Sequence, residues 1–225
     1  MLIATRLGGR LPHIDYKWIA PSNTTLGILM AALNGSIILI ALPPIFRSIG
    51  VNPLAPGETS YLLWSLLGYM VVTATLLVTC GRISDMFGRV RLYNLGFAIF
   101  TVGSILLYFI QDQGNGAALQ LIIYRLIKGV GAAFLFANST AILTDAFPPA
   151  ERDGDGVNQI AGIGGGFVGL ILGGLLAVIN WRVVFLVSVP FGVIGTIWAY
   201  LMLRGMARRK EQQKLDLLRN FFFVG

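Results

Sequence analysis

Six long runs of mainly apolar residues constrain the fold of this 225-residue chain more than any other feature. About 20 apolar residues span the hydrocarbon core of a bilayer as an α-helix. Lipid offers the backbone no hydrogen-bond partners, so each run must satisfy its own peptide groups as a helix. The sequence therefore predicts an all-α integral membrane protein, with spans at Thr25–Phe46, Tyr61–Cys80, Leu92–Ile110, Leu119–Phe147, Ile160–Ile179 and Val183–Leu203.

Charge and composition exclude several other classes of protein. Only 12% of the residues are charged, whereas a soluble domain is about a quarter charged. The net charge of +7 gathers at the ends of the apolar runs and forms no basic face interleaved with aromatic residues, which argues against nucleic acid. The single cysteine, Cys80, excludes an intrachain disulfide, and the single histidine, His13, has no metal ligands around it. We expect no metal, no cofactor and no enzymatic nucleophile–base pair.

Lysine and arginine predict the orientation in the membrane. With the N-terminal arm inside, the inner segments hold thirteen of the 17 basic residues, and the outer links hold only Arg47 and Arg182. The positive-inside rule then places the N-terminus and both ends of the six-helix block in the cytoplasm of a multi-pass plasma-membrane protein. The expected organisation is a cytoplasmic arm (residues 1–24), a six-helix bundle (25–203), and a basic cytoplasmic linker with the start of a seventh helix (204–225).

The link between the second and third runs, Gly81 to Arg91, combines two glycines, an aspartate and three arginines. Gly81 lets a helix end lie close to its neighbours, and Gly88 can adopt the positive φ of a tight reversal. Asp85 stays ionised among arginines, and it can pair with them or lie at a helix N-terminus. A simple basic turn that obeys the positive-inside rule is the alternative.

This link resembles a loop motif of the major facilitator superfamily, G-x-x-x-D-x-x-G-R-x-R/K. The resemblance implies a cytoplasmic gating loop, which would latch onto a helix of the other half of the transporter. All five defining positions match: Gly81, Asp85, Gly88, Arg89 and Arg91.

Two basic residues lie inside the fourth run. Arg125 is six residues from its outer end, a depth of about 9 Å at 1.5 Å per residue. A charge at mid-helix costs about 2.5–3.5 kcal/mol on insertion scales, so it normally faces a cavity or a partner. Lys128 lies one turn away on the same face. The alternative for both is snorkelling towards the outer interface.

The sequence around these two residues resembles the fourth-helix motif of the same superfamily, R-x-x-Q-G-x-G-A-A. The resemblance implies a role for Arg125 in proton transfer. Lys128 stands where glutamine is usual, and the matching positions are Arg125, Gly129, Gly131, Ala132 and Ala133.

The fifth run is rich in glycine. Gly165, Gly169 and Gly173 are spaced four apart, which forms a groove where another helix can approach closely. Their spacing resembles G-x-x-x-G-P-x-x-G-G, the antiporter motif of drug/proton exchangers, with Gly174 as a further match. Leu170 replaces the proline, so the helix should bend less. Plain helix packing is the alternative, and the lack of a preceding strand excludes a dinucleotide site.

The first run contains Asn34 in a stretch similar to L-D-x-T-I-V-N-V-A-L-P of the fourteen-helix drug/proton antiporter branch. Asn34 replaces the membrane-embedded aspartate of that branch and cannot titrate. It can hydrogen-bond a substrate or a neighbouring helix. No Asp or Glu lies deep in a run, so this half offers no obvious acid for proton coupling. The final residues, from Leu215, resemble the start of the branch's seventh helix.

The resemblance implies the N-terminal half of a major facilitator transporter, with the chain cut short in helix seven. The function it implies is proton-coupled export of drugs or other amphipathic small molecules, with Asn34, Arg125 and Lys128 along the substrate and proton pathway. The alternatives are a uniporter of another substrate class and a non-transporting fragment or half-transporter. The expected partners are the lipid bilayer, a small-molecule substrate, protons, and a C-terminal half or a second copy of the chain.

Overall fold

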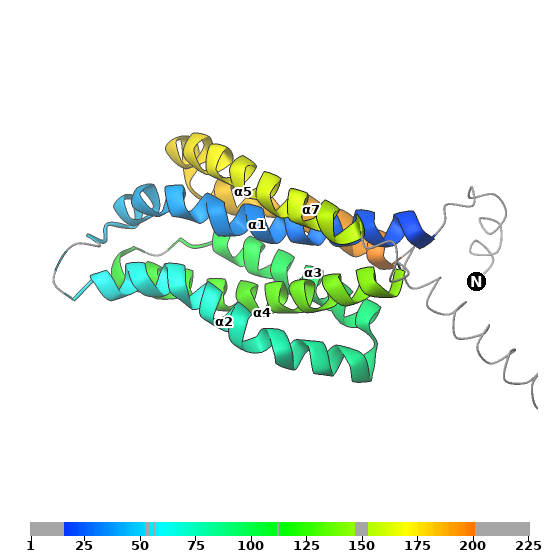
Figure 1. The fold of residues 1–225 in the computed structure, drawn as a ribbon. Coiled ribbons are helices and arrows are strands. Elements are labelled where there is room, and N and C mark those ends of the chain that lie inside the picture. The colour runs from blue at the N-terminus through cyan, green and yellow to red at the C-terminus, as the bar shows by residue number, and fades with distance from the viewer. Residues whose placement is uncertain (1–15, 53–54, 56, 112, 147–152, 201–225) are drawn as a thin grey trace, which may run out of the picture.

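The computed structural model describes residues 16–52, 55, 57–111, 113–146 and 153–200 (Figure 1). Five helices in this part are long and apolar enough to cross a membrane, and Val183–Trp198 forms a shorter apolar segment. No strand occurs among these residues, so the predicted all-α class is confirmed. The helices are α1 (Tyr16–Ile49), α2 (Thr59–Phe87), α3 (Arg89–Tyr108), α4 (Gly114–Ala146), α5 (Asp153–Asn180), α6 (Val183–Leu186) and α7 (Ser188–Trp198).

The predicted sixth span corresponds to α6 and α7 together. Val187 joins them with φ −53° and ψ −37°, so the backbone remains helical through the join. Three of the residues predicted for this span, 201–203, lie outside the described residues, as do the predicted linker and seventh-helix start at 204–225. The predicted N-terminal arm is helical from Tyr16 onwards.

The junction of α2 and α3 corrects the prediction of an eleven-residue cytoplasmic loop. α2 continues to Phe87 and α3 begins at Arg89, so Gly88 alone separates them. The reason is that this stretch contains no proline, and the single reversal needs only one residue with positive φ, which Gly88 supplies at 101°. Gly81 does not end a helix, and a Cβ added there would meet nothing within 4 Å. Its predicted close approach is therefore wrong, whereas the positive φ of Gly88 is confirmed.

Helix contacts place α1 and α4 at the centre of the bundle. α5 packs mainly on α1, α2 and α3 pack mainly on α4, and α1 and α4 contact each other, while α7 lies against α3 and α1. The start of α1, the α2–α3 junction, the end of α4 and the end of α7 gather at one end of the bundle (Figure 1). This arrangement agrees with the predicted inner segments. The side of the membrane that this end faces stays a prediction.

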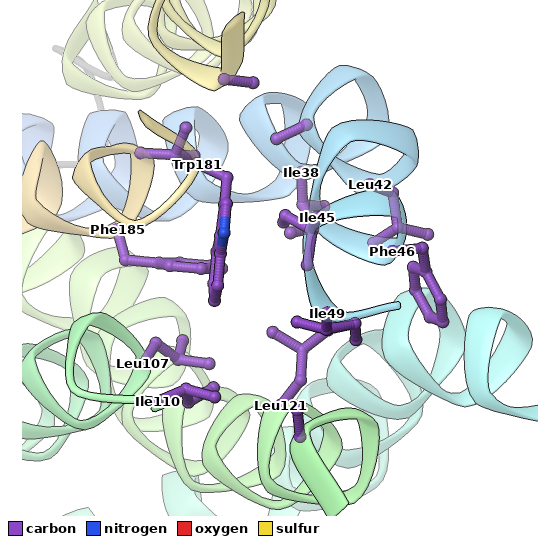
Figure 2. Packing of buried hydrophobic residues seen from close by; sticks show 14 of the residues in the cluster. Ile38, Leu42, Ile45, Phe46, Ile49, Leu107, Ile110, Leu121, Trp181 and Phe185 are labelled. Carbon is purple, nitrogen blue, oxygen red and sulfur yellow. The ribbon is translucent and has the colours of Figure 1, made fainter. Parts of the chain in front are cut away.

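A hydrophobic cluster closes the opposite end of the bundle (Figure 2). The rings of Trp181 and Phe185 meet edge to face at 6.2 Å between centroids. The indole Nε1 of Trp181 donates a hydrogen bond to Ser48 Oγ at 2.8 Å, which fastens the α5–α6 connection to the end of α1. The cluster joins α1, α3, α4 and α6 through residues that include Ile38, Ile45, Leu107 and Leu121.

Candidate functional site

The glycines of α5 bring that helix into backbone contact with α1. A Cβ added at Gly165, Gly169 or Gly173 would lie 2.9, 2.7 or 2.6 Å from a carbonyl oxygen of α1, closer than real Cβ contacts come. Gly174 is looser, since its added Cβ would lie 3.7 Å from a side-chain carbon. The four-residue spacing therefore does form a close-packed groove. The three carbonyls are one turn apart and belong to Leu29, Leu33 and Ile37.

Glycines also surround the central turn of α4. A Cβ on Gly129 would lie 3.1 Å from the carbonyl oxygen of Tyr69 in α2, and one on Gly131 would lie 2.6 Å from the backbone nitrogen of Phe100 in α3. On the α3 side, Gly103 leaves room for Lys128, whose Cα is 3.3 Å from the added Cβ. Two helices thus close tightly around the turn that carries Arg125 and Lys128.

The structure brings Asn34, Arg125 and Lys128 together inside the bundle. Lys128 is 0% exposed, and Arg125 and Asn34 are 1% exposed. The Nζ atom of Lys128 donates a hydrogen bond to Asn34 Oδ1 at 2.5 Å, which joins α4 to α1 across 94 residues of sequence. Neither basic side chain snorkels out of the bundle. The grouping of the three residues agrees with a shared site, and their role along a pathway stays a prediction.

Aromatic rings enclose the two cations. Lys128 Nζ lies 4.6 Å from the centroid of the Phe100 ring and 5.8 Å from that of Phe185, and Arg125 Cζ lies 5.4 Å from that of Tyr69. A cation over the face of a ring is attracted by the ring's quadrupole. Sequence reasoning missed these three aromatic residues. They come from α2, α3 and α6 and belong to no motif, so only the tertiary structure identifies them.

Hydrogen bonding around the cluster is incomplete. Within the described part of the chain, no group accepts a hydrogen bond from Arg125 Nε or Nη1. Asn34 Nδ2 and the Tyr69 hydroxyl lie near each other but form no hydrogen bond of good geometry. Buried polar groups in folded proteins almost always have partners. The site therefore presents a set of buried donors, among them a guanidinium fork, that its described surroundings leave unsatisfied.

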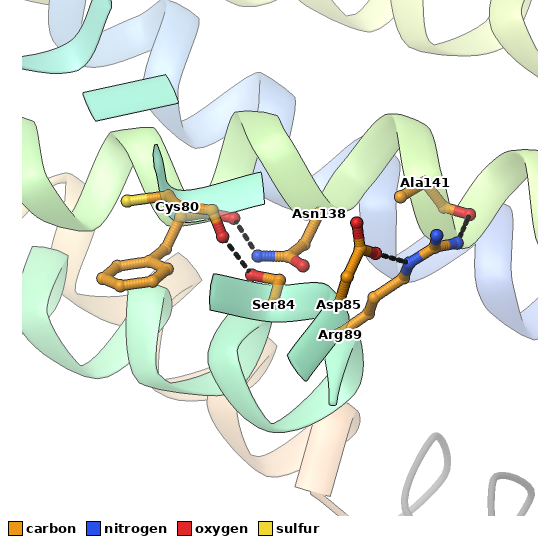
Figure 3. A network of polar contacts seen from close by, with 7 residues as sticks. Cys80, Ser84, Asp85, Arg89, Asn138 and Ala141 are labelled. Atoms are coloured by element: carbon orange, nitrogen blue, oxygen red, sulfur yellow. Dashed lines mark hydrogen bonds and ion pairs between the residues drawn. The ribbon is translucent and has the colours of Figure 1, made fainter. Parts of the chain in front are cut away.

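The α2–α3 junction forms a second polar site (Figure 3). Asp85 Oδ1 and Arg89 Nε form an ion pair at 2.8 Å, and Arg89 Nη1 also donates to the carbonyl oxygen of Ala141 in α4 at 3.4 Å. Of the two predicted roles for Asp85, pairing with an arginine is therefore the one observed. Asp85 lies near the C-terminal end of α2 and not at a helix N-terminus.

Arg91, the last residue of the predicted gating loop, does not join this ion pair. It lines a cavity of about 390 Å³ between α3 and α7. The other lining residues are Val90, Asn94, Leu95, Ala98, Thr196, Ala199 and Tyr200.

Comparison with curated proteins finds several transporters. The chain is 30% identical to "Riboflavin transporter RibZ" of Clostridioides difficile, over 89% of this chain and 42% of that protein. It is 30% identical to "Multidrug resistance protein 3" of Bacillus subtilis, over 85% of this chain and 35% of that protein. It is 32% identical to "Drug efflux pump JefA" of Mycobacterium tuberculosis, over 86% of this chain and 36% of that protein. The chain thus spans well under half the length of each of these relatives.

The model of one protein family, described as the Major Facilitator Superfamily, matches residues 24–222. This match covers most of the sequence and includes every described helix from the first span onwards. The apolar helices and the family match together indicate a multi-pass membrane protein. The chain therefore belongs to the Major Facilitator Superfamily.

Proposed function

We propose that this chain forms the N-terminal bundle of a proton-coupled exporter of drugs or other amphipathic small molecules. The observation that carries the proposal is the buried cluster of Asn34, Lys128 and Arg125 on the two central helices. Polar and charged residues inside a membrane bundle are costly, and they commonly mark substrate or ion pathways. The names of the drug-exporting relatives support this substrate class.

The proposed mechanism is alternating access between two bundles, with the substrate site at their interface. The second bundle is a C-terminal half or a second copy of this chain. Large apolar side chains on α2 and α5 are exposed, which suits contact with lipid or with that second bundle. Examples are Trp64, Met70 and Val78 on α2, and Phe167 and Ile171 on α5.

The ion pair of Asp85 and Arg89 is proposed to act as a latch at the cytoplasmic end of the bundle. Its link to the α4 carbonyl of Ala141 means that a change at the latch reaches the helix that carries Arg125. We propose that this end faces the cytoplasm and that the membrane is the plasma membrane, in line with the distribution of basic residues.

A second candidate is transport of another substrate class, with or without proton coupling. The riboflavin transporter among the relatives favours it, as does the residue at position 34. An asparagine there can bind a polar substrate but cannot carry a proton. Arg125 and Lys128 are then substrate ligands and take no part in proton transfer.

Efflux measurements in energised bacterial cells test the proposal. The 225-residue chain would be expressed alone, and also as a chimera that replaces the matching segment of the Bacillus subtilis relative. Ethidium, fluorescein and riboflavin would be followed with and without a proton uncoupler, with Arg125→Ala as the paired variant. We expect uncoupler-sensitive efflux of ethidium or fluorescein in at least one form, and its loss in Arg125→Ala.

Riboflavin movement without efflux of either dye would select the second candidate. If none of the three compounds moves although both forms are found in the membrane, the transport proposal is wrong. Uncoupler-insensitive efflux would retain transport and reject proton coupling.

A further inference from the structure

We propose that the Arg125–Lys128–Asn34 cluster is an anion-binding site, and that it selects substrates carrying a carboxylate or a similar planar anionic group. This inference rests on the proposed transport function, because it names the substrate class for the same buried residues.

Two basic side chains share this site, and the described chain offers them no acidic partner. Arg125 keeps its charge in proteins, and Lys128 lies three residues away on the same helix face. Charges inside a membrane bundle are normally paired with one another or with a ligand. The hydrogen bond from Lys128 to Asn34 satisfies one donor but brings no negative charge. The buried positive charge of Arg125 therefore needs an anion from elsewhere.

The acidic residues in the described part of the chain lie towards the helix ends, away from this site. Glu58 stands at the N-terminal end of α2, where it accepts a hydrogen bond from the backbone of Asn52, and Asp85 is paired with Arg89 near the other end. Asp145 is on the same helix as Arg125 but 20 residues further along, about 30 Å at the helical rise. Every acidic residue of the sequence lies at or beyond the ends of the apolar runs.

The unsatisfied donors suit an anionic group with more than one oxygen. Arg125 presents Nε and Nη1 without acceptors. Nη1 lies on the Cδ side of the guanidinium group and the N–H of Nε points away from that side, so each atom can donate to a separate acceptor. Charged donors of this kind bind the oxygens of an anion strongly. Asn34 Nδ2, which lies near the Tyr69 hydroxyl, is a further buried donor in the site.

The walls of the site favour an aromatic anion over a small inorganic one. The rings of Tyr69, Phe100 and Phe185 surround the cationic groups, and they offer apolar surface to a ring attached to the carboxylate. Chloride could neutralise the positive charge, but it would make no stabilising apolar contact with these rings. A planar aromatic carboxylate satisfies both the donors and the walls.

Two dyes with the same ring system and opposite charge provide the test. Fluorescein is an anionic xanthene with a carboxylate, and rhodamine 6G is a cationic xanthene ester. Binding of each to the purified 225-residue chain in lipid nanodiscs would be measured by fluorescence anisotropy. We expect fluorescein to bind at least ten times more tightly than rhodamine 6G, and sodium benzoate to compete better than equimolar sodium chloride.

Matched variants locate the binding. Lys128→Gln and Arg125→Gln should each weaken fluorescein binding at least tenfold, whereas Lys128→Arg, which keeps the charge, should retain it. Arg82→Gln is the control, because Arg82 is an exposed arginine at the end of α2 and its removal changes net charge equally. The temperature at which the buried thiol of Cys80 becomes reactive towards a thiol-specific fluorophore checks that each variant is folded.

The proposal is overturned if rhodamine 6G binds as tightly as fluorescein, or if folded Lys128→Gln and Arg125→Gln bind fluorescein like the unsubstituted chain. If the two Gln variants do not fold, loss of binding in Lys128→Arg overturns it instead. Equal competition by chloride and benzoate would reject the carboxylate preference. Binding is measured without transport, so the two proposals can fail separately. Ethidium efflux without fluorescein binding would overturn the anion site and leave the proposed function standing. Fluorescein binding without efflux of any compound would reject the transport function and leave the anion site standing.

Discussion

The contact between α1 and α5 predicts that one added methyl group at Gly169 destabilises the bundle. In Gly169→Ala the new Cβ would lie 2.7 Å from the carbonyl oxygen of Leu33 and 3.1 Å from Ser36 Cβ. An ordinary contact begins near 3.4 Å, so α5 must retreat by about 3.4 − 2.7 = 0.7 Å at this point. Backbone atoms cannot swing aside as a flexible side chain would.

Gly164→Ala is the matched control. It lies on the same helix, and its added Cβ meets nothing within 4 Å. Both substitutions gain about 1 kcal/mol of helix propensity, so the difference between them isolates the clash. Overpacking costs about 1–3 kcal/mol. At about 2–4 °C per kcal/mol for a chain of this size, Gly169→Ala should melt about 2–12 °C below Gly164→Ala.

The sole cysteine supplies the assay. Cys80 is 3% exposed in the folded bundle and lies on α2, away from the α1–α5 contact. A thiol-reactive fluorophore in detergent would report unfolding during a thermal ramp. Equal melting temperatures for Gly169→Ala and Gly164→Ala would refute the close packing of α5 on α1.

Two further substitutions test other parts of the fold by the same thermal assay. Gly88→Ala should lower the free energy of unfolding by about 1–3 kcal/mol, because a φ of 101° strains any residue other than glycine. Gly81→Ala is the control and should not destabilise the bundle, since its added Cβ meets nothing within 4 Å. Equal effects of the two substitutions would contradict the one-residue junction. Trp181→Phe should lower the free energy of unfolding by about 0.5–1.5 kcal/mol, because the hydrogen bond to Ser48 is lost. Trp198→Phe is the control and should have a smaller effect, since Trp198 is exposed. The reverse order of the two effects would reject the contact between Trp181 and Ser48.

The sequence predicts the helices of this protein well, because the length of each apolar run reflects the thickness of the bilayer. Their ends are harder to predict. α1 begins well before Thr25, and α2 continues through Gly81 to Phe87. Hydropathy marks where lipid begins, whereas a helix continues into polar sequence until a residue such as Gly88 ends it. The predicted length of the junction is therefore wrong, although the glycine that forms it is predicted correctly.

The candidate site divides in the same way. Asn34, Arg125 and Lys128 are conspicuous in the sequence because polar groups are rare inside apolar runs. Their mutual contact could not be predicted, since it depends on how α1 and α4 cross. The aromatic neighbours Tyr69 and Phe100 could not be identified from the sequence, because aromatic residues are common in membrane helices. Only their positions beside Arg125 and Lys128 distinguish them.

In this account, positive charge inside the described bundle has no acidic partner and is met by an anionic substrate. Asn34→Asp tests it most directly, because it places a carboxylate where Asn34 Oδ1 now accepts the hydrogen bond of Lys128. The measurement is the affinity of the purified variant for fluorescein in nanodiscs, with the Cys80 melt as the check on folding. We predict at least a tenfold loss of fluorescein affinity in a folded variant, because the new carboxylate pairs with Lys128 and repels the anion. A folded Asn34→Asp protein that binds fluorescein as tightly as the unsubstituted chain would contradict the claim.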